Sequence, residues 1–295
     1  METPEVSSGS VPRDSTHFTN ADGHKIYYRR WVPQHAPRAV LFLCHGVAEH
    51  IERYNPLAST LADKGILVVG NDHVGHGKSE GIRVDCRNFR EYVRDLLQLV
   101  HMVKDEQPNI QSDIPHFLFG HSMGGGVAIL AALDSPGLFS GVLLSAPIVI
   151  INPEQATSFK ICLVRATALL FPQLHVGSLN FDHLSRDPEQ VKAYINDPLV
   201  YTRGMKARWS LCALNALQEI EERLRDITWP YLLMHGSDDQ LVLKEGSEML
   251  HEKSQSEDKT LKIYPDYRHE ILNEPKEYSD VVVNDIVSWL EERIS

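Results

Sequence analysis

Residues 116–133 read HFLFGHSMGGGVAILAAL, a short apolar run followed by the pattern G-x-S-x-G and a second apolar run. The first run has the length and continuous apolar character of a strand buried on both faces, and the second continues with helical periodicity. Gly120 and Gly124 leave room for a tight strand-to-helix turn that lifts Ser122 out at the carboxyl edge of a sheet. The bare pattern could also be a packing turn, but this context favours a nucleophile.

Short apolar strands alternate with helical segments along most of the chain, which predicts a mostly parallel central sheet flanked by helices. We expect strands that begin at Ala39, Ile66, His116, Gly141, Tyr231 and Leu261. Helical periodicity covers residues 55–64, 89–104, 123–133, 244–253 and 277–292. Residues 16–31 have the pattern of a β-hairpin. The expected fold class is therefore α/β.

Roughly eighty residues between Pro147 and Trp229 break this alternation, because they contain no convincing strand. We expect a helical cap at residues 150–225, inserted after the sixth strand over the carboxyl edge of the sheet, where open α/β sheets place their ligands. The alternative is a small helical packing unit without a role in binding. The remaining chain is then a disordered tail at 1–14 and a core divided between 15–149 and 226–295.

Composition excludes several classes of protein. The 29 Lys and Arg against 40 Asp and Glu give a net charge of −11, and no basic run is present, which argues against a nucleic-acid partner. The four cysteines are widely spaced, so we expect neither a disulfide framework nor a metal site, and no cofactor. No apolar leader or membrane-spanning run occurs, which predicts a cytoplasmic protein that is not secreted. Oligomeric state stays open.

A serine hydroxyl needs a base to remove its proton, and the base needs a carboxylate to hold its tautomer. After a G-x-S-x-G turn the expected chain order is Ser, then Asp or Glu, then His. Asp239 and His269 follow the last two predicted strands, so we expect Ser122, Asp239 and His269 as nucleophile, acid and base. The neighbouring Asp238 is an alternative for the acid.

Two backbone N–H groups are expected to form an oxyanion hole. Met123 supplies one at the start of the helix, and the loop H-G-V-A-E-H at residues 45–50 supplies the second through Val47, since Gly46 permits close backbone approach. An ordinary turn is the alternative for this loop. Five loop histidines, none of them after the last strand, are expected to be hydrogen-bonding supports rather than the base: His45, His50, His73, His76 and His121.

Three motifs together resemble the monoacylglycerol lipase family: H-G-x-x-E-H from His45, D-H-x-G-H-G-x-S-E-G from Asp72 and G-H-S-M-G-G from Gly120. The resemblance extends from about residue 16 to the C-terminal helix. It implies an α/β-hydrolase fold with a helical cap, and hydrolysis of monoacylglycerols to fatty acid and glycerol through an acyl-enzyme on Ser122. It also implies which residues contact the glycerol end of the substrate: Glu49, Arg53, His121 and Tyr194.

The chain departs from the family pattern at several positions. Val47 stands where vertebrate members carry alanine, and the family's cap and rim cysteines are replaced by Tyr201, Arg208 and Val242, so thiol-directed sensitivity is not implied. The cap is the least similar part, which leaves acyl-chain preference open. A lysophospholipase or broad carboxylesterase of the same fold, including transfer to another alcohol, is the alternative. A non-enzymatic binding module is disfavoured because no triad residue is missing.

The apolar segment that begins at Phe159 has two interpretations. Its apolar face, around Leu163, Ala166 and Leu170, could dock on a membrane peripherally, or it could pack against the rest of the protein.

Overall fold

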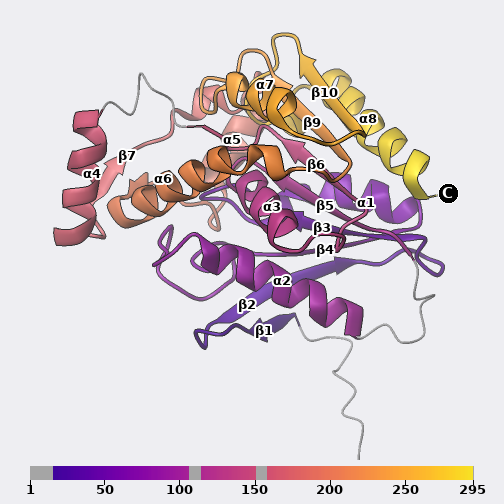
Figure 1. Ribbon diagram of the computed structural model, residues 1–295, viewed down its shortest axis with the longest axis horizontal. Helices are drawn as coiled ribbons and strands as arrows, with labels where there is room; N and C mark the ends of the chain where they lie inside the picture. The colour runs from indigo at the N-terminus through magenta and orange to yellow at the C-terminus, as the bar shows by residue number, and fades with distance from the viewer. Residues whose placement is uncertain (1–15, 106–113, 151–157, 295) are drawn as a thin grey trace, which may run out of the picture.

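The computed structural model describes residues 16–105, 114–150 and 158–294 (Figure 1). The predicted tail at 1–14 lies outside these residues. The centre of the described chain is an eight-stranded sheet with the order β1-β2-β4-β3-β5-β6-β9-β10. Its strands are β1 (His17–Thr19), β2 (Lys25–Trp31), β3 (Ala39–Cys44), β4 (Ile66–Asn71), β5 (His116–His121), β6 (Gly141–Ser145), β9 (Tyr231–Gly236) and β10 (Lys259–Tyr264).

The pairing of these strands is mostly parallel. β1 and β2 form the predicted hairpin, and β2 pairs antiparallel with β4. From β4 to β10 every neighbouring pair is parallel. This arrangement confirms the predicted α/β-hydrolase fold. The predicted first residues of these strands are confirmed except at β10, which begins two residues earlier than expected.

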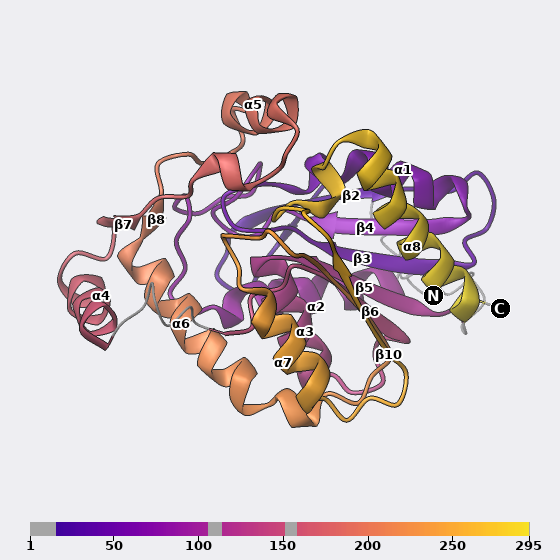
Figure 2. The ribbon, with the colours of Figure 1, turned by 90° about the horizontal axis from the view of Figure 1, so that it is seen from above.

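Helices cover both faces of the sheet (Figure 2). They are α1 (Asn55–Asp63) and α8 (Lys276–Ile294) on one face, and α2 (Arg90–Asp105), α3 (Met123–Asp134) and α7 (Lys244–Lys253) on the other. Alternate residues of β3 therefore serve two cores: Phe42 packs with α2 and α3, whereas Leu41 and Leu43 pack with α1 and α8. Burial on both faces is the reason that the strands are continuously apolar.

The chain between β6 and β9 forms the insertion, by which we mean residues 158–226. It contains α4 (Ser158–Leu170), β7 (His175–Gly177), α5 (Pro188–Asn196), β8 (Met205–Lys206) and α6 (Ala207–Glu222). The expectation of no strand here is wrong, because β7 and β8 pair antiparallel. These strands have three and two residues, too few to produce a detectable alternation.

The insertion lies beyond the carboxyl ends of the parallel strands (Figures 1 and 2). It comes directly after the sixth strand, as expected. Short 3-10 turns complete the described chain at η1 (Ile51–Tyr54), η2 (Phe181–His183), η3 (Leu224–Asp226) and η4 (Ile271–Asn273). Within the ranges given above, no helix combines the length and apolar character needed to span a membrane.

Candidate active site

Ser122 occupies a strained turn between β5 and α3. Its φ of 53° and ψ of −117° lie outside the regions that non-glycine residues prefer. The surrounding backbone holds this conformation, since the Ser122 N–H donates to the Ser145 carbonyl oxygen at 3.0 Å and the Ser122 carbonyl accepts from Ile148 at 3.1 Å. A residue in an unfavourable conformation that its surroundings enforce is typical of a nucleophile position.

The glycines on either side of Ser122 are required by close backbone approach. A Cβ on Gly120 would lie 2.3 Å from the Gly124 carbonyl oxygen, and one on Gly124 would lie 2.3 Å from the carbonyl oxygen of Cys44 at the end of β3. Neither position can accept a side chain, because both neighbours are backbone atoms. The two glycines of the G-x-S-x-G pattern are therefore explained by the close packing of α3 against β3 and β5.

His269 and Asp239 form a short hydrogen bond after the last two strands of the sheet. His269 Nδ1 lies 2.7 Å from Asp239 Oδ2, and the Leu241 and Val242 N–H groups donate to Asp239 Oδ1 at 2.8 and 2.9 Å. A carboxylate only accepts, so Nδ1 carries the proton and a neutral His269 keeps its lone pair on Nε2. The structure thus brings Asp239 to the histidine, whereas the side chain of Asp238 is 48% exposed, near Arg268.

The electrostatics of this pair favour its charged forms. Burial alone would raise the pKa of Asp239, but His269 and His235 hold it well below 3.8. Burial alone would also lower the pKa of His269, yet Asp239 and then Glu270 raise it above 6.5. A histidine that acts as a general base becomes an imidazolium when it accepts the proton of a nucleophile. A buried carboxylate beside it stabilises that charged form.

Ser122 and His269 line one cavity of about 160 Å³. Its other lining residues from the core are Gly46, Val47, Glu49, His121, Ile148, Leu241, Val242 and Glu270, and those from the insertion are Leu179, Leu184, Tyr194, Met205 and Trp209. The insertion therefore contributes a largely apolar wall to the cavity that Ser122 lines. The cavity contains four of the predicted binding and oxyanion residues: Val47, Glu49, His121 and Tyr194.

The loop that carries Val47 lies beside Ser122. A Cβ on Gly46 would lie 3.4 Å from Ser122 Cβ, in ordinary contact, and 2.8 Å from Glu49 Oε1, which would have to move. His45 Nε2 accepts from the His73 N–H at 2.9 Å, which leaves its Nδ1 to donate to the Gly46 carbonyl oxygen at 2.7 Å. Because the C=O and N–H of a trans peptide point in opposite directions, this bond directs the Val47 N–H away from His45.

Arg53 connects three parts of the site. Its guanidinium donates to both oxygens of Glu270 at 2.7 Å, forms an ion pair with Glu49, and lies 4.6 Å from the ring centre of Tyr194. Burial alone would lower the pKa of Arg53, but the charges of Glu270 and Glu49 raise it well above its usual range. Arg53 is not among the residues that line the cavity. Its predicted substrate contact stays a prediction, and these bonds give it a bracing position.

Glu49 holds the predicted oxyanion loop, residues 45–50, through its backbone and through Tyr54. Its Oε1 accepts from the Gly46 N–H at 2.6 Å and from the Tyr54 hydroxyl at 2.8 Å. The sequence patterns did not indicate Tyr54, which donates to Glu49, or Glu270, which shares Arg53 with Glu49. Glu270 directly follows His269, the predicted base, which was a usable signal, but nothing in the sequence pairs it with Arg53, 217 residues earlier.

All five loop histidines are buried, and burial holds the pKa of four of them below its ordinary value: His45, His73, His76 and His121. His121 Nδ1 lies 3.1 Å from the carbonyl oxygen and hydroxyl of Ser145, and burial together with His269 lowers the pKa of His121 to about 4. Burial lowers the pKa of His73 to about 3 and that of His76 to about 4. His50 Nε2 bonds to Asp197 Oδ2 at 2.9 Å and so ties the oxyanion loop to the insertion.

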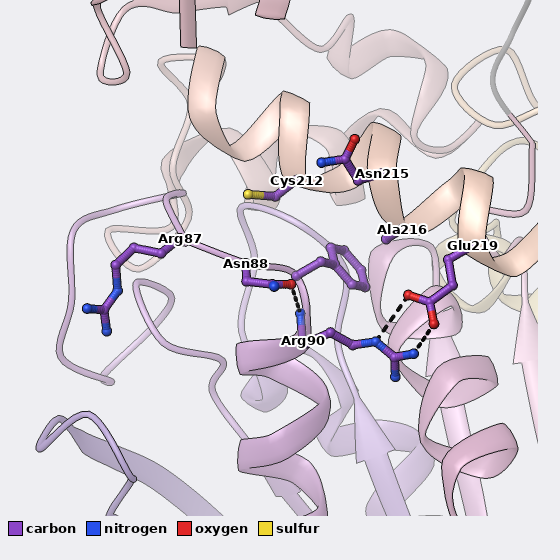
Figure 3. A pocket seen from close by; sticks show the side chains of 8 residues that line it. Arg87, Asn88, Arg90, Cys212, Asn215, Ala216 and Glu219 are labelled. Atoms are coloured by element: carbon purple, nitrogen blue, oxygen red, sulfur yellow. Dashed lines mark hydrogen bonds and ion pairs between the residues drawn. The ribbon is translucent and has the colours of Figure 1, made fainter. Parts of the chain in front are cut away.

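A separate cavity of about 230 Å³ lies between α6 and residues 87–90 (Figure 3). Figure 3 shows Arg90 in an ion pair with Glu219 at its edge and Cys212 on its wall. It contains none of the predicted site residues. The described part of the chain also holds no cluster of His, Cys, Asp or Glu suited to a metal ion.

Comparison with known proteins identifies the family of the chain. The family model described as serine aminopeptidase, S33, matches residues 35–276. The chain is 40% identical to human monoglyceride lipase over 99% of this chain and 95% of the relative. It is 36% identical to the monoacylglycerol lipase of Mycolicibacterium smegmatis over 95% of this chain and 98% of that protein.

The fold matches solved structures closely. The crystal structure of a monoacylglycerol lipase from Paleococcus ferrophilus superposes with a TM-score of 0.81 at 29% identity, covering 91% of this chain and 99% of that one. The 36–40% identity to the two lipases over nearly the whole chain, together with the family model that matches residues 35–276, establishes the family. The chain belongs to the monoglyceride lipase family of α/β-hydrolases.

Proposed function

We propose that this protein hydrolyses monoacylglycerols to a fatty acid and glycerol through an acyl-enzyme on Ser122. The observation that carries the proposal is the cavity, in which Ser122 and His269 lie beside polar groups of Glu49, His121 and Tyr194 and beneath an apolar wall. A single-chain lipid ester has the same division between a polar head and an apolar tail. Names of relatives at 36–40% identity support the same substrate class.

The proposed chemistry follows the geometry of the triad. His269 Nε2 removes the proton of Ser122 as the hydroxyl oxygen attacks the ester carbonyl, and Asp239 stabilises the imidazolium through the 2.7 Å bond. The Val47 and Met123 N–H groups bind the oxyanion of the tetrahedral intermediate. The imidazolium gives its proton to the departing glycerol oxygen. Water then repeats the sequence on the acyl-enzyme and releases the fatty acid.

The glycerol end is proposed to lie against Glu49, His121 and Tyr194, with Arg53 behind them. Glu49 and Tyr194 both contact the Arg53 guanidinium, so a single cation orients the two groups. The acyl chain is proposed to lie along the wall that the insertion provides, which makes residues 150–225 a cap in function.

A substrate panel tests the assignment. Purified protein would be assayed with a long-chain monoacylglycerol, a lysophosphatidylcholine of the same chain, and a short water-soluble ester. We expect the monoacylglycerol to have the highest kcat/KM, because the polar groups of Glu49, His121 and Tyr194 in the cavity suit the hydroxyl groups of glycerol. A higher kcat/KM for the lysophospholipid would contradict the proposal and favour a lysophospholipase.

The pH dependence of the reaction is a second prediction. The base must be neutral to accept the Ser122 proton, so kcat/KM should rise with pH as His269 loses its proton. Since Asp239 raises the pKa of His269, we expect the midpoint of this rise above pH 6.5. The neutral His121, with a pKa of about 4, should add no step near neutrality. A pH–rate profile with a midpoint below 6.5 would argue against His269 as the base.

We also propose peripheral contact with lipid membranes through α4 and the residues that follow it. Three large apolar side chains there are strongly exposed: Leu169 at 81%, Leu170 at 72% and Phe171 at 64%. Leu163 and Leu174 are exposed beside them, so packing against the protein does not account for this surface. Because the net charge is −11, anionic lipids would repel the protein, and the proposed binding rests on apolar contact.

Vesicle sedimentation tests this contact. The double substitution Leu169→Asp and Phe171→Asp should reduce the fraction of protein that sediments with neutral phosphatidylcholine vesicles by several-fold, because two charges would enter the interface. Val32 is similarly exposed, at 70%, but lies on the loop after β2, so Val32→Asp is the matched control and should bind like wild type. Equal sedimentation of all three proteins would refute the contact.

A further inference from the structure

His235 is a fully buried histidine that the proposed reaction does not use. It is the fifth residue of β9, and its Nε2 lies 3.1 Å from Asp239 Oδ2 and 3.1 Å from the Val242 carbonyl oxygen. Both of these oxygens only accept hydrogen bonds, so His235 Nε2 carries a proton and donates to them. Its Nδ1 lies 2.7 Å from the hydroxyl oxygen of Ser247 on α7, which can donate to a neutral ring.

Asp239 Oδ2 is therefore shared between two histidines. It accepts from His269 Nδ1 at 2.7 Å and from His235 Nε2 at 3.1 Å, while Oδ1 accepts from two backbone N–H groups. The donors on Oδ1 come from the loop after β9, and His235 comes from β9 itself. Together they fix the plane of the carboxylate against which His269 is oriented.

We propose that His235 is a positioning residue, which acts through Asp239 to set the orientation and basicity of His269. The inference rests on the proposed function of the triad. A donor on the shared oxygen withdraws electron density from the carboxylate and so weakens its hold on the His269 proton. The same donor prevents Asp239 from turning toward His269 alone. His235 does not line the cavity, so it affects the reaction without touching substrate.

The groups that surround the two histidines define what a pH experiment reports. Asp239, Glu270 and Glu49 raise the pKa of His269 through their charges, and the ring of His121 lies 4.8 Å from the His269 ring. His235 contacts two side chains: Asp239, on the loop after β9, and the uncharged Ser247, on α7. Removal of His235 therefore leaves the charges around His269 in place, while Asp239 and the Val242 carbonyl lose a donor and Ser247 loses its partner.

The test is the pH–rate profile of two variants on one monoacylglycerol. His235→Leu removes the donor, so the acid midpoint of kcat/KM should move to higher pH by about half a unit to one unit, with kcat about tenfold lower and KM unchanged. His235→Gln keeps an N–H donor for Asp239 and an oxygen that can accept from Ser247, so it should retain the wild-type midpoint. A merely structural role would lower the melting temperature of the leucine variant without moving the midpoint, and that result would overturn the proposal.

Two further proteins keep the test decisive. Ser247→Ala removes the bond that holds the His235 ring, so it should move the midpoint in the same direction by less; if the leucine variant does not fold and Ser247→Ala leaves the midpoint unchanged, the proposal is overturned. His251→Leu is the matched control, because His251 lies on α7 and bonds to the Tyr231 hydroxyl at 3.2 Å without contacting the triad. It should retain the wild-type midpoint. Failure of the triad itself would be recognised separately, by activity that persists in Ser122→Ala.

Discussion

Substitution of Ser122 by alanine should lower kcat for monoacylglycerol hydrolysis by about 10⁵-fold to 10⁶-fold, since the acyl-enzyme can no longer form. The residual rate would come from the oxyanion N–H groups and from substrate binding, which the substitution leaves intact. Alanine keeps the Cβ and hence the backbone strain at φ 53°, so the fold and melting temperature should be unaffected.

The measurement is a steady-state rate with labelling by a fluorophosphonate probe. Wild type should label at one site and Ser122→Ala at none. Ser237→Ala is a suitable control, because Ser237 lies exposed after β9 and its hydroxyl accepts only from the Asp266 N–H among the contacts described. Hydrolysis by Ser122→Ala at the wild-type rate would contradict the nucleophile assignment outright.

Replacement of Asp239 by asparagine is expected to have the next largest effect, a fall in kcat of about 10⁴-fold. Every neighbour of this carboxylate is a donor: His235 and His269 on Oδ2, and the Leu241 and Val242 N–H groups on Oδ1. An amide has one acceptor and one donor group, so its NH₂ must oppose donors in either orientation. The histidine would then take the tautomer with its proton on Nε2, which cannot act as a base.

The neighbouring carboxylate provides the control for this experiment. Asp238→Asn changes the same residue type one position away, but the Asp238 side chain is half exposed and does not contact His269. We expect wild-type kcat for Asp238→Asn and a lower melting temperature only for Asp239→Asn, where the unsatisfied NH₂ is buried. Equal losses in the two variants would mean that the choice between these residues is wrong.

Much of the fold could be predicted because its signals are local. The inner parallel strands β3, β4, β5, β6 and β9 are buried on both faces, which produces continuous apolar runs. The glycines around Ser122 are required by atoms within a few residues or on the neighbouring strand. The hairpin at 16–31 also follows from a short-range pattern. The short strands β7 and β8 escaped detection, since two or three residues cannot display a period.

The sequence itself determined the order of three residues, Ser122, Asp239 and His269, and the strand ends that carry them. Parallel strands bring their carboxyl ends to a single edge of the sheet. The choice of Asp239 over Asp238 was decided only by the tertiary structure, which directs one carboxylate to His269 and leaves the other in solvent. The same holds for the ion pairs of Arg53 with Glu49 and Glu270, and for His235 behind the acid. Hydrogen bonds between side chains distant in sequence depend on where the folded backbone places them, and a linear pattern carries no record of that placement.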